Sequence, residues 1–155
     1  MASYNDQNAA VKALNDLIAT LRDAEEGYAK AAKGVHNTHL SNRLVDLSGE
    51  CGKFADEIVA LVQNLGAEAS KDAHFGGILH KGWVDLETRI RPKSEVEIVR
   101  ECIAGEGETV KHFQHAVSVE LPAEARSVVE RQLQKIQTEL SDLEDLTEKG
   151  KVQHA

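Results

Sequence analysis

Residues 40–65, LSNRLVDLSGECGKFADEIVALVQNL, carry apolar side chains at alternating intervals of three and four residues. This spacing places the apolar side chains along one side of an α-helix, where they form the packing seam of a helical bundle. The pattern predicts a helix from about residue 39 to Leu65, ended by Gly66. The seam consists of Leu40, Leu44, Leu47, Cys51, Phe54, Ile58, Leu61 and Leu65.

A second seam lies upstream, in a helix predicted to begin at a cap on Asn5 or Asp6 and to run to about Gly34. Its apolar members are Val11, Leu14, Ile18, Leu21, Tyr28, Ala32 and Val35. The spacing requires a residue at position 25, and that residue is Glu25. A short turn follows, with Thr38 as the expected cap of the next helix. Two long helices joined by so short a turn must lie antiparallel.

The second half of the chain follows the same plan. Ser94 and Glu97 form a predicted capping box at the start of a helix that runs to about Ser118. The apolar face of this helix consists of Val99, Cys102, Ile103, Val110, Phe113 and Val117. Glu106 lies at the centre of that face, which makes it an inward-facing carboxylate.

The last helix is predicted over about residues 123–149, after a turn at residues 121–122. Its seam consists of Val129, Leu133, Ile136, Leu140 and Leu143. Between the two hairpins, a shorter helix is predicted over about residues 74–90, and Pro92 ends it. A helix of about 17 residues extends about 25 Å, enough to return along the bundle. The fourth helix then runs parallel to the second.

These elements predict an all-α fold: a four-helix bundle of two antiparallel hairpins with an additional short crossover helix. A long crossover between two hairpins is the arrangement of ferritin-like bundles. The 155 residues suit a single domain, with an ordered core expected over about residues 6–149. Hydrophobic residues make up 41% of the chain and aromatic residues only 4%, a composition that favours packing of helix on helix.

Charge and cysteine content narrow the function classes. The net charge of −8 argues against binding nucleic acid, which requires clustered Lys and Arg, and against an anionic membrane surface. Cys51 and Cys102 fall inside helical patterns and are expected as buried thiols of a reducing compartment. The first ten residues lack the apolar segment of a signal peptide, and no apolar run approaches the roughly 18 residues of a membrane span. We therefore expect a cytoplasmic protein.

Glu25, Glu50 and Glu106 are predicted to lie at one height in the bundle. Counted from the same end, they lie about 11, 12 and 12 residues along their helices, within about one turn of each other. Glu50 is rotated by about 65° from its seam and is half inward. Buried carboxylates repel one another unless a cation neutralises them, and oxygen-rich sites suit iron or manganese. Inward glutamates from different helices are the ligands of di-iron bundles.

Each of these candidate metal ligands also has a purely structural interpretation. Glu25 or Glu106 would otherwise bond to a nearby Arg, Lys, Tyr28 or water, and Glu50 would form an ion pair at the rim. Glu26 would replace Glu25 as a ligand if the helix phase were shifted slightly. The heights favour a metal site but leave these alternatives open.

His80 and Trp83 lie on the predicted crossover helix. His80 is at roughly the height of the carboxylates, where it would supply an imidazole ligand or, alternatively, a hydrogen-bonded packing contact. Trp83 is predicted to fasten the crossover to the bundle. Gly105 and Gly107 flank Glu106 inside a helix at a cost of about 1 kcal/mol each, which indicates close helix approach or a site that needs backbone room.

Four stretches carry a resemblance to a known family: LNDLIATLRDAEEGY (14–28), ILHKGWVDLE (78–87), ECIAGEGE (101–108) and LPAEARSVVERQL (121–133). Together they resemble a bacterial family of small four-helix-bundle proteins that is grouped with ferritin-like proteins and has no established function. The resemblance covers about residues 11–146. It implies a ferritin-like fold and a candidate metal site, and it implies no activity.

The chain departs from the di-iron pattern of such bundles, which places Glu-x-x-His on two helices. Glu50 is followed at that spacing by Lys53. On the last helix, the inward position at the matching height falls near Gln137 or Leu140, and neither is a strong metal ligand. A complete di-iron site is therefore not expected.

Two functions are compatible with these observations. The first is a ferritin-like protein, a weak oxidase or a stress-related metal binder, that binds iron or manganese through Glu25, Glu26, Glu50, Glu106 and His80. The second is a non-catalytic bundle with a degenerate metal site that acts through protein–protein interaction or self-association as a homo-oligomer. The sequence identifies no reaction.

Overall fold

The computed structural model describes residues 4–70, 83 and 94–148, and four long helices account for nearly all of them. The helices are α1 (Tyr4–Gly34), α2 (Thr38–Asn64), α4 (Glu95–Ser118) and α5 (Ala123–Glu148). The described ranges contain no β-strand, and none of their helices has the length and apolarity needed to cross a membrane. The predicted crossover helix at 74–90, including His80, lies outside the described residues.

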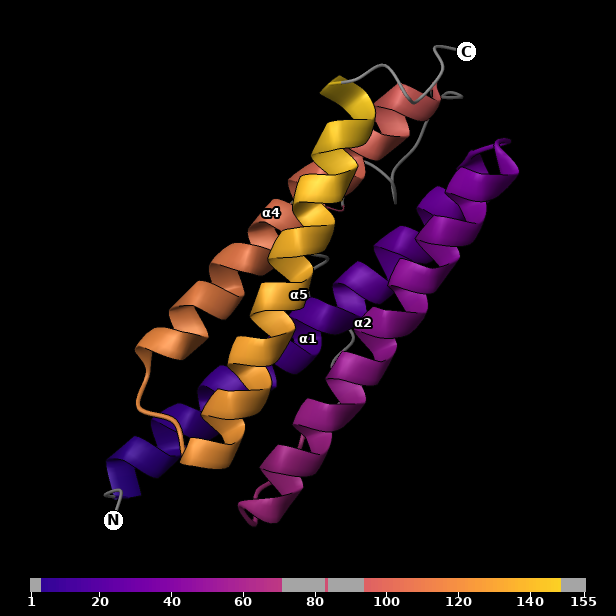
Figure 1. Cartoon of the computed structure of the whole chain (residues 1–155). Helices are drawn as coiled ribbons and strands as arrows, with labels where there is room; N and C mark the ends of the chain where they lie inside the picture. The colour runs from indigo at the N-terminus through magenta and orange to yellow at the C-terminus, as the bar shows by residue number, and fades with distance from the viewer. Residues whose placement is uncertain (1–3, 71–82, 84–93, 149–155) are drawn as a thin grey trace.

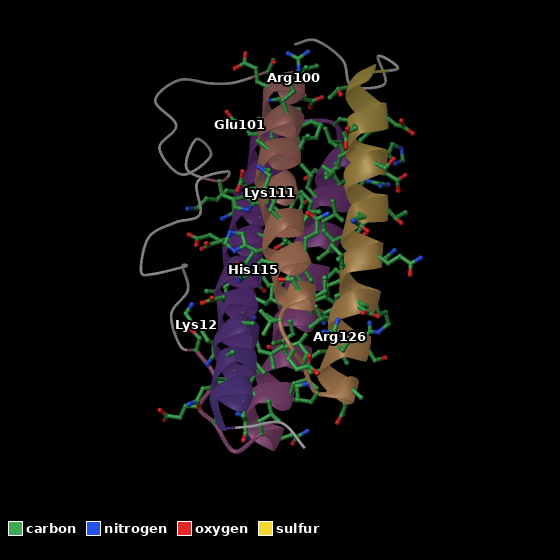
Figure 2. The ribbon with its side chains drawn as sticks, turned by 90° about the vertical axis from the view of Figure 1, so that its left-hand side faces the viewer. Lys12, Arg100, Glu101, Lys111, His115 and Arg126 are labelled. Atoms are coloured by element: carbon green, nitrogen blue, oxygen red, sulfur yellow. The ribbon has the colours of Figure 1, made fainter. Side chains whose placement is uncertain are left out.

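The helices form two antiparallel hairpins, and α4 runs in the same direction as α2, as predicted (Figure 1). Helix α1 packs against α2 and α4, and α5 packs against α4 and α2, so every neighbouring pair is antiparallel. The packing between α2 and α5 is the loosest of the four pairs. Figure 2 shows α4 between α1 and α5, with Arg100, Lys111 and His115 along it.

Local signals in the sequence set the helix ends. The Ser94 side chain accepts a hydrogen bond from the backbone N–H of Glu97 at 3.2 Å, which confirms the predicted capping box. The cap of α2 is Asn37 rather than the predicted Thr38, because the Asn37 side chain accepts from the N–H of Leu40 at 3.0 Å. Gly66 has a φ of 77°, the left-handed conformation that ends a helix, as predicted.

Two seams are rotated slightly from their predicted phase. In α1, Ala24 is buried and Glu25 is only partly buried, so the seam passes through Ala24. In α5, the buried positions are Gln132 and Glu139, whereas Leu133 and Leu140 are only partly buried. Intervals of three and four can be phased in either order. The sequence prediction chose Glu25 rather than Ala24 on α1, and the apolar Leu133 and Leu140 on α5. On α5 the polar residues are the inward ones.

Trp83 packs between α1 and α4, which confirms the predicted fastening role. Its side chain is 1% exposed. A Cβ atom placed on Gly27 or Gly105 would lie 2.2 or 2.3 Å from the indole ring, so both positions must be glycine while the ring is there. The indole also meets the Tyr28 ring edge-on, with centroids 5.0 Å apart. Close approach of an aromatic ring therefore explains Gly105, whereas a Cβ on Gly107 would meet nothing within 4 Å.

Candidate metal centre

Four glutamates, one from each helix, act electrostatically on the same buried group in the bundle: Glu25, Glu50, Glu106 and Glu139. This group is the Cys51 thiol. Burial raises the pKa of this thiol most, and the charges of all four glutamates raise it further. The four carboxylates therefore lie within electrostatic reach of a single point in the core.

Glu106 is the most deeply buried of the four, with 1% of its surface exposed. Its Oε2 atom accepts a hydrogen bond from the Tyr28 hydroxyl. Its Oε1 atom is buried and has no partner among the residues that the structure describes. Burial raises the pKa of Glu106 to about 7; the Tyr28 hydrogen bond opposes this shift and the charge of Glu50 adds to it. Glu106 is thus about half protonated near pH 7.

Glu139 and Glu50 form a hydrogen-bonded carboxyl pair across α5 and α2. Glu139 is 7% exposed. Burial, the hydrogen bond to Glu50 and the charge of Glu50 raise the pKa of Glu139 to about 8, and Lys135, with its Nζ 4.0 Å away, lowers it. Repulsion between two neighbouring carboxylates opposes ionisation, and it favours the protonated form of Glu139.

Glu25 lies at the rim of this cluster. Its side chain is 39% exposed, and its Oε1 atom lies 3.4 Å from an Arg22 guanidinium nitrogen. Its Oε2 atom packs against Gly52, where a Cβ atom would lie only 2.3 Å away. Glu26 instead forms an ion pair with Lys30 at 2.9 Å. The structure therefore brings Glu50, Glu106 and Glu139 together, keeps Glu25 beside them and directs Glu26 elsewhere.

Glu139 is the site residue that sequence reasoning missed. The prediction that the last helix brings no acid to this height, only Gln137 or Leu140, is wrong. The buried positions Gln132, Ile136, Glu139 and Leu143 follow the same three-and-four spacing as the predicted seam. That spacing was visible in the sequence, but Leu140 is adjacent to Glu139 and more apolar.

The donors of the cluster are carboxylate oxygens with no imidazole at the usual spacing. Three residues after Glu50 stands Lys53, and three residues after Glu139 stands Asp142, which pairs with Arg43 at 3.3 Å. Within the described part of the chain, no three His, Cys, Asp or Glu side chains converge closely enough to hold a metal ion as they stand. Protons and hydrogen bonds satisfy most of the carboxylate oxygens instead.

A groove of about 580 Å³ on α2 reaches this cluster from outside. It is lined by Val45, Asp46, Gly49, Glu50, Lys53, Phe54 and Glu57. Glu50 belongs both to the groove and to the carboxyl pair with Glu139. All of the lining residues belong to α2, so the groove brings one member of the cluster, Glu50, into contact with solvent.

Comparisons with known proteins agree with this architecture. A family model described as a domain of unknown function (DUF2383) matches residues 9–118. The bacterioferritin of Desulfovibrio desulfuricans, solved with its di-iron site in different catalytic states, superimposes with a TM-score of 0.75 at 15% identity, covering 95% of this chain and 84% of that one. A conserved hypothetical protein from Mycobacterium tuberculosis gives 0.70 at 14% identity, covering 94% and 99%.

No functionally curated protein matches the chain. At these identities the structural likeness shows the fold alone, and that fold is the ferritin-like four-helix bundle predicted from the sequence.

Proposed function

We propose that this chain, which belongs to the family described as a domain of unknown function (DUF2383), binds one iron or manganese ion through Glu50, Glu106 and Glu139. The observation that carries the proposal is the buried Oε1 atom of Glu106, which lacks a partner among the described residues. An unsatisfied buried acceptor costs about 1–3 kcal/mol. A cation beside it would remove that cost and neutralise its carboxylate neighbours.

The proton held by the Glu50–Glu139 pair supports the same proposal. A buried carboxyl cluster must bind protons or a cation, because several negative charges cannot stay together in a dry core. Metal binding would break the hydrogen bond between the two acids, release its proton and free the oxygens for the ion. An all-oxygen donor set suits iron or manganese better than zinc or copper.

The residues fit one ion better than two. The bacterioferritin is described with a di-iron site, whereas this chain has Lys53 and Asp142 where two-iron bundles place histidines. Iron held by the three glutamates would supply redox or storage chemistry. Tyr28 would orient Glu106 through its hydroxyl. The assignment of Glu25, Glu26 and His80 as metal ligands stays a prediction from the sequence. Of these three, Glu25 lies beside the cluster, and its charge raises the pKa of the Cys51 thiol.

Equilibrium binding of Mn²⁺, or of Fe²⁺ without oxygen, to tag-free protein tests the proposal. We expect about one ion per chain, with proton release on binding. Glu106→Gln should weaken binding by at least one order of magnitude. Glu130→Gln is the matched control, because Glu130 pairs with Arg126 on the exposed face of α5, and it should leave affinity unchanged. Substoichiometric metal that is equal in both variants contradicts the proposal.

A second candidate function is that of a non-catalytic bundle acting through self-association. It is favoured by Val45, a large hydrophobic residue on α2 that is 55% exposed. Sedimentation over a range of protein concentrations tests this candidate. Association that is lost in Val45→Ser supports it, and a monomer at every concentration rules it out.

A further inference from the structure

Two opposite sides of the glutamate cluster are built differently. On the α1–α4 side, the Trp83 indole fills the space between Gly27 and Gly105 and covers Tyr28. On the α2–α5 side, the groove on α2 has Glu50 in its wall. A hydrated ion can approach the cluster only where charged or polar groups replace its water, so the α2–α5 side is the better path.

Gln132 is a buried polar group at one end of this groove. It is 0% exposed, and its Nε2 atom donates at 3.2 Å to the carbonyl of Phe54 and to Oε1 of Glu57, both of which line the groove. Because both neighbours are acceptors, the amide must present its nitrogen to them. Its oxygen is then a buried acceptor without a partner among the described residues. Gln132 therefore adds an unpartnered buried oxygen next to two residues that line the groove, although Gln132 does not line the groove itself.

Asp46 and Lys53 are the exposed charged residues of the groove and act in opposite senses. Asp46 attracts a divalent cation and Lys53 repels it. Glu57 is held by Arg131 and Gln132 and is largely neutralised by the arginine. The field along the groove is therefore set mainly by Asp46, Glu50 and Lys53.

We propose that the groove on α2 is the path by which a hydrated divalent cation reaches the Glu50–Glu139 pair, with Asp46 accelerating its arrival, Lys53 retarding it and Glu50 passing it inward. This proposal rests on the proposed metal-binding function. The ion exchanges bound water for carboxylate oxygens step by step, and Glu50 can take part in both stages because it is half-buried between groove and core.

Stopped-flow mixing with Mn²⁺ tests the path. The chain has one tryptophan, and Trp83 packs on Tyr28, which bonds Glu106, so its fluorescence reports on the site. At low ionic strength, Asp46→Asn should slow association by about two- to fivefold, and Lys53→Gln should accelerate it by a similar factor. Asp46 and Lys53 act mainly on the ion during its passage through the groove. Each substitution should therefore change the association and dissociation rate constants in the same direction, and the dissociation constant should change less than either rate constant.

The control is Asp16→Asn, the same change of charge on α1, where Asp16 pairs with Lys12. Its rates should match those of the unmodified chain. Equal slowing in Asp46→Asn and Asp16→Asn would mean that overall charge alone acts, and it would overturn the path. Normal Mn²⁺ affinity with unchanged rates in all three variants would overturn the path but leave the metal site intact. Absence of Mn²⁺ binding to the unmodified chain by equilibrium dialysis would overturn both.

Discussion

The α1–α4 side of the glutamate cluster is closed by an aromatic ring, whereas the α2–α5 side is lined by acids, an amide and a groove. On the first side, Trp83 packs between Gly27 and Gly105, where no larger residue fits. On the second, Glu50, Glu139 and Gln132 meet between loosely packed helices. The first side contributes stability through packing density. The second retains polar groups that a purely structural core would replace with apolar ones.

This contrast also explains the two protonation states in the cluster. Glu106 belongs to the closed side, where Tyr28 bonds it and burial dominates its pKa. Glu139 belongs to the open side, where its acid partner Glu50 is half-buried and lines the groove. On the proposed path, Glu50 is therefore the residue through which an ion would enter, and the closed side holds Glu106 in place.

Removal of the Trp83 ring, which closes the α1–α4 side, should have the largest effect on stability. Trp83→Ala deletes a fully buried aromatic side chain, and we expect it to lower the free energy of unfolding by about 3–5 kcal/mol. Urea denaturation followed by circular dichroism measures this, since the variant loses the fluorescent residue. Trp83→Phe, which keeps a ring between the glycines, should lose less. A cost below about 1 kcal/mol for Trp83→Ala would mean that the closed side does not depend on the ring.

The next largest effect should be a fall in the free energy of unfolding as the pH rises. The pKa of Glu106 rises from 4.5 to about 7 on folding, so the folded chain binds a proton more tightly than the unfolded one. Protonation of Glu106 therefore contributes to the free energy of unfolding. This contribution is fully present below about pH 4.5 and falls by roughly 3 kcal/mol as the pH rises to about 7. Glu139 adds a loss in the same direction that continues to about pH 8.

Urea denaturation at about pH 5 and about pH 8 checks this sign. Glu106→Gln should flatten the fall in stability between the two pH values, and Glu26→Gln should leave it unchanged. Saturating Mn²⁺ should reverse the trend in the unmodified chain, because a bound cation competes with protons. A stability difference between Glu106→Gln and the unmodified chain that stays constant with pH would contradict the raised pKa.

Much of this arrangement was predictable from the sequence, because local signals determine it. The caps at Ser94 and Gly66, the seam of α2 and the inward position of Glu106 each depend on residues within a few positions of one another. The DUF2383 match over residues 9–118 confirms the family resemblance and contains three of its four sequence stretches, whereas the stretch 121–133 lies beyond the match.

The phase of the seams in α1 and α5 was not predictable with the same precision. A single residue shifts a side chain by about 100° around the helix, and only the packing partners decide between neighbours such as Ala24 and Glu25. Glu139 was missed for this reason. The contact of Trp83 with Gly27 and Gly105 was also not predictable, because only the tertiary fold brings these two glycines together.

Substitution of the two glycines that flank Glu106 should change stability by smaller amounts and in opposite directions. Gly105→Ala places a Cβ atom 2.3 Å from the indole ring and should cost about 1–3 kcal/mol by overpacking. Gly107→Ala meets nothing within 4 Å and should stabilise the helix by about 0.5–1 kcal/mol. Thermal denaturation of the pair measures both. Equal effects would show that helix propensity, rather than contact with Trp83, governs position 105.

The smallest effect is expected for Gln132→Leu on the open side. This change removes a buried amide whose oxygen lacks a described partner. The hydrogen bonds lost are those to the Phe54 carbonyl and to Glu57, which keeps its ion pair with Arg131. Removing a partly satisfied buried polar group is close to neutral, so we expect a change within about 1 kcal/mol and towards higher stability.

A loss of more than about 2 kcal/mol in the Gln132→Leu variant would make Gln132 a structural clamp between α2 and α5. The expected near-neutral result would show that Gln132 is not such a clamp. Slower Mn²⁺ uptake in the same variant would then connect that amide to the groove, and Gln134→Leu, at an exposed position of α5, is the control that should leave uptake unchanged.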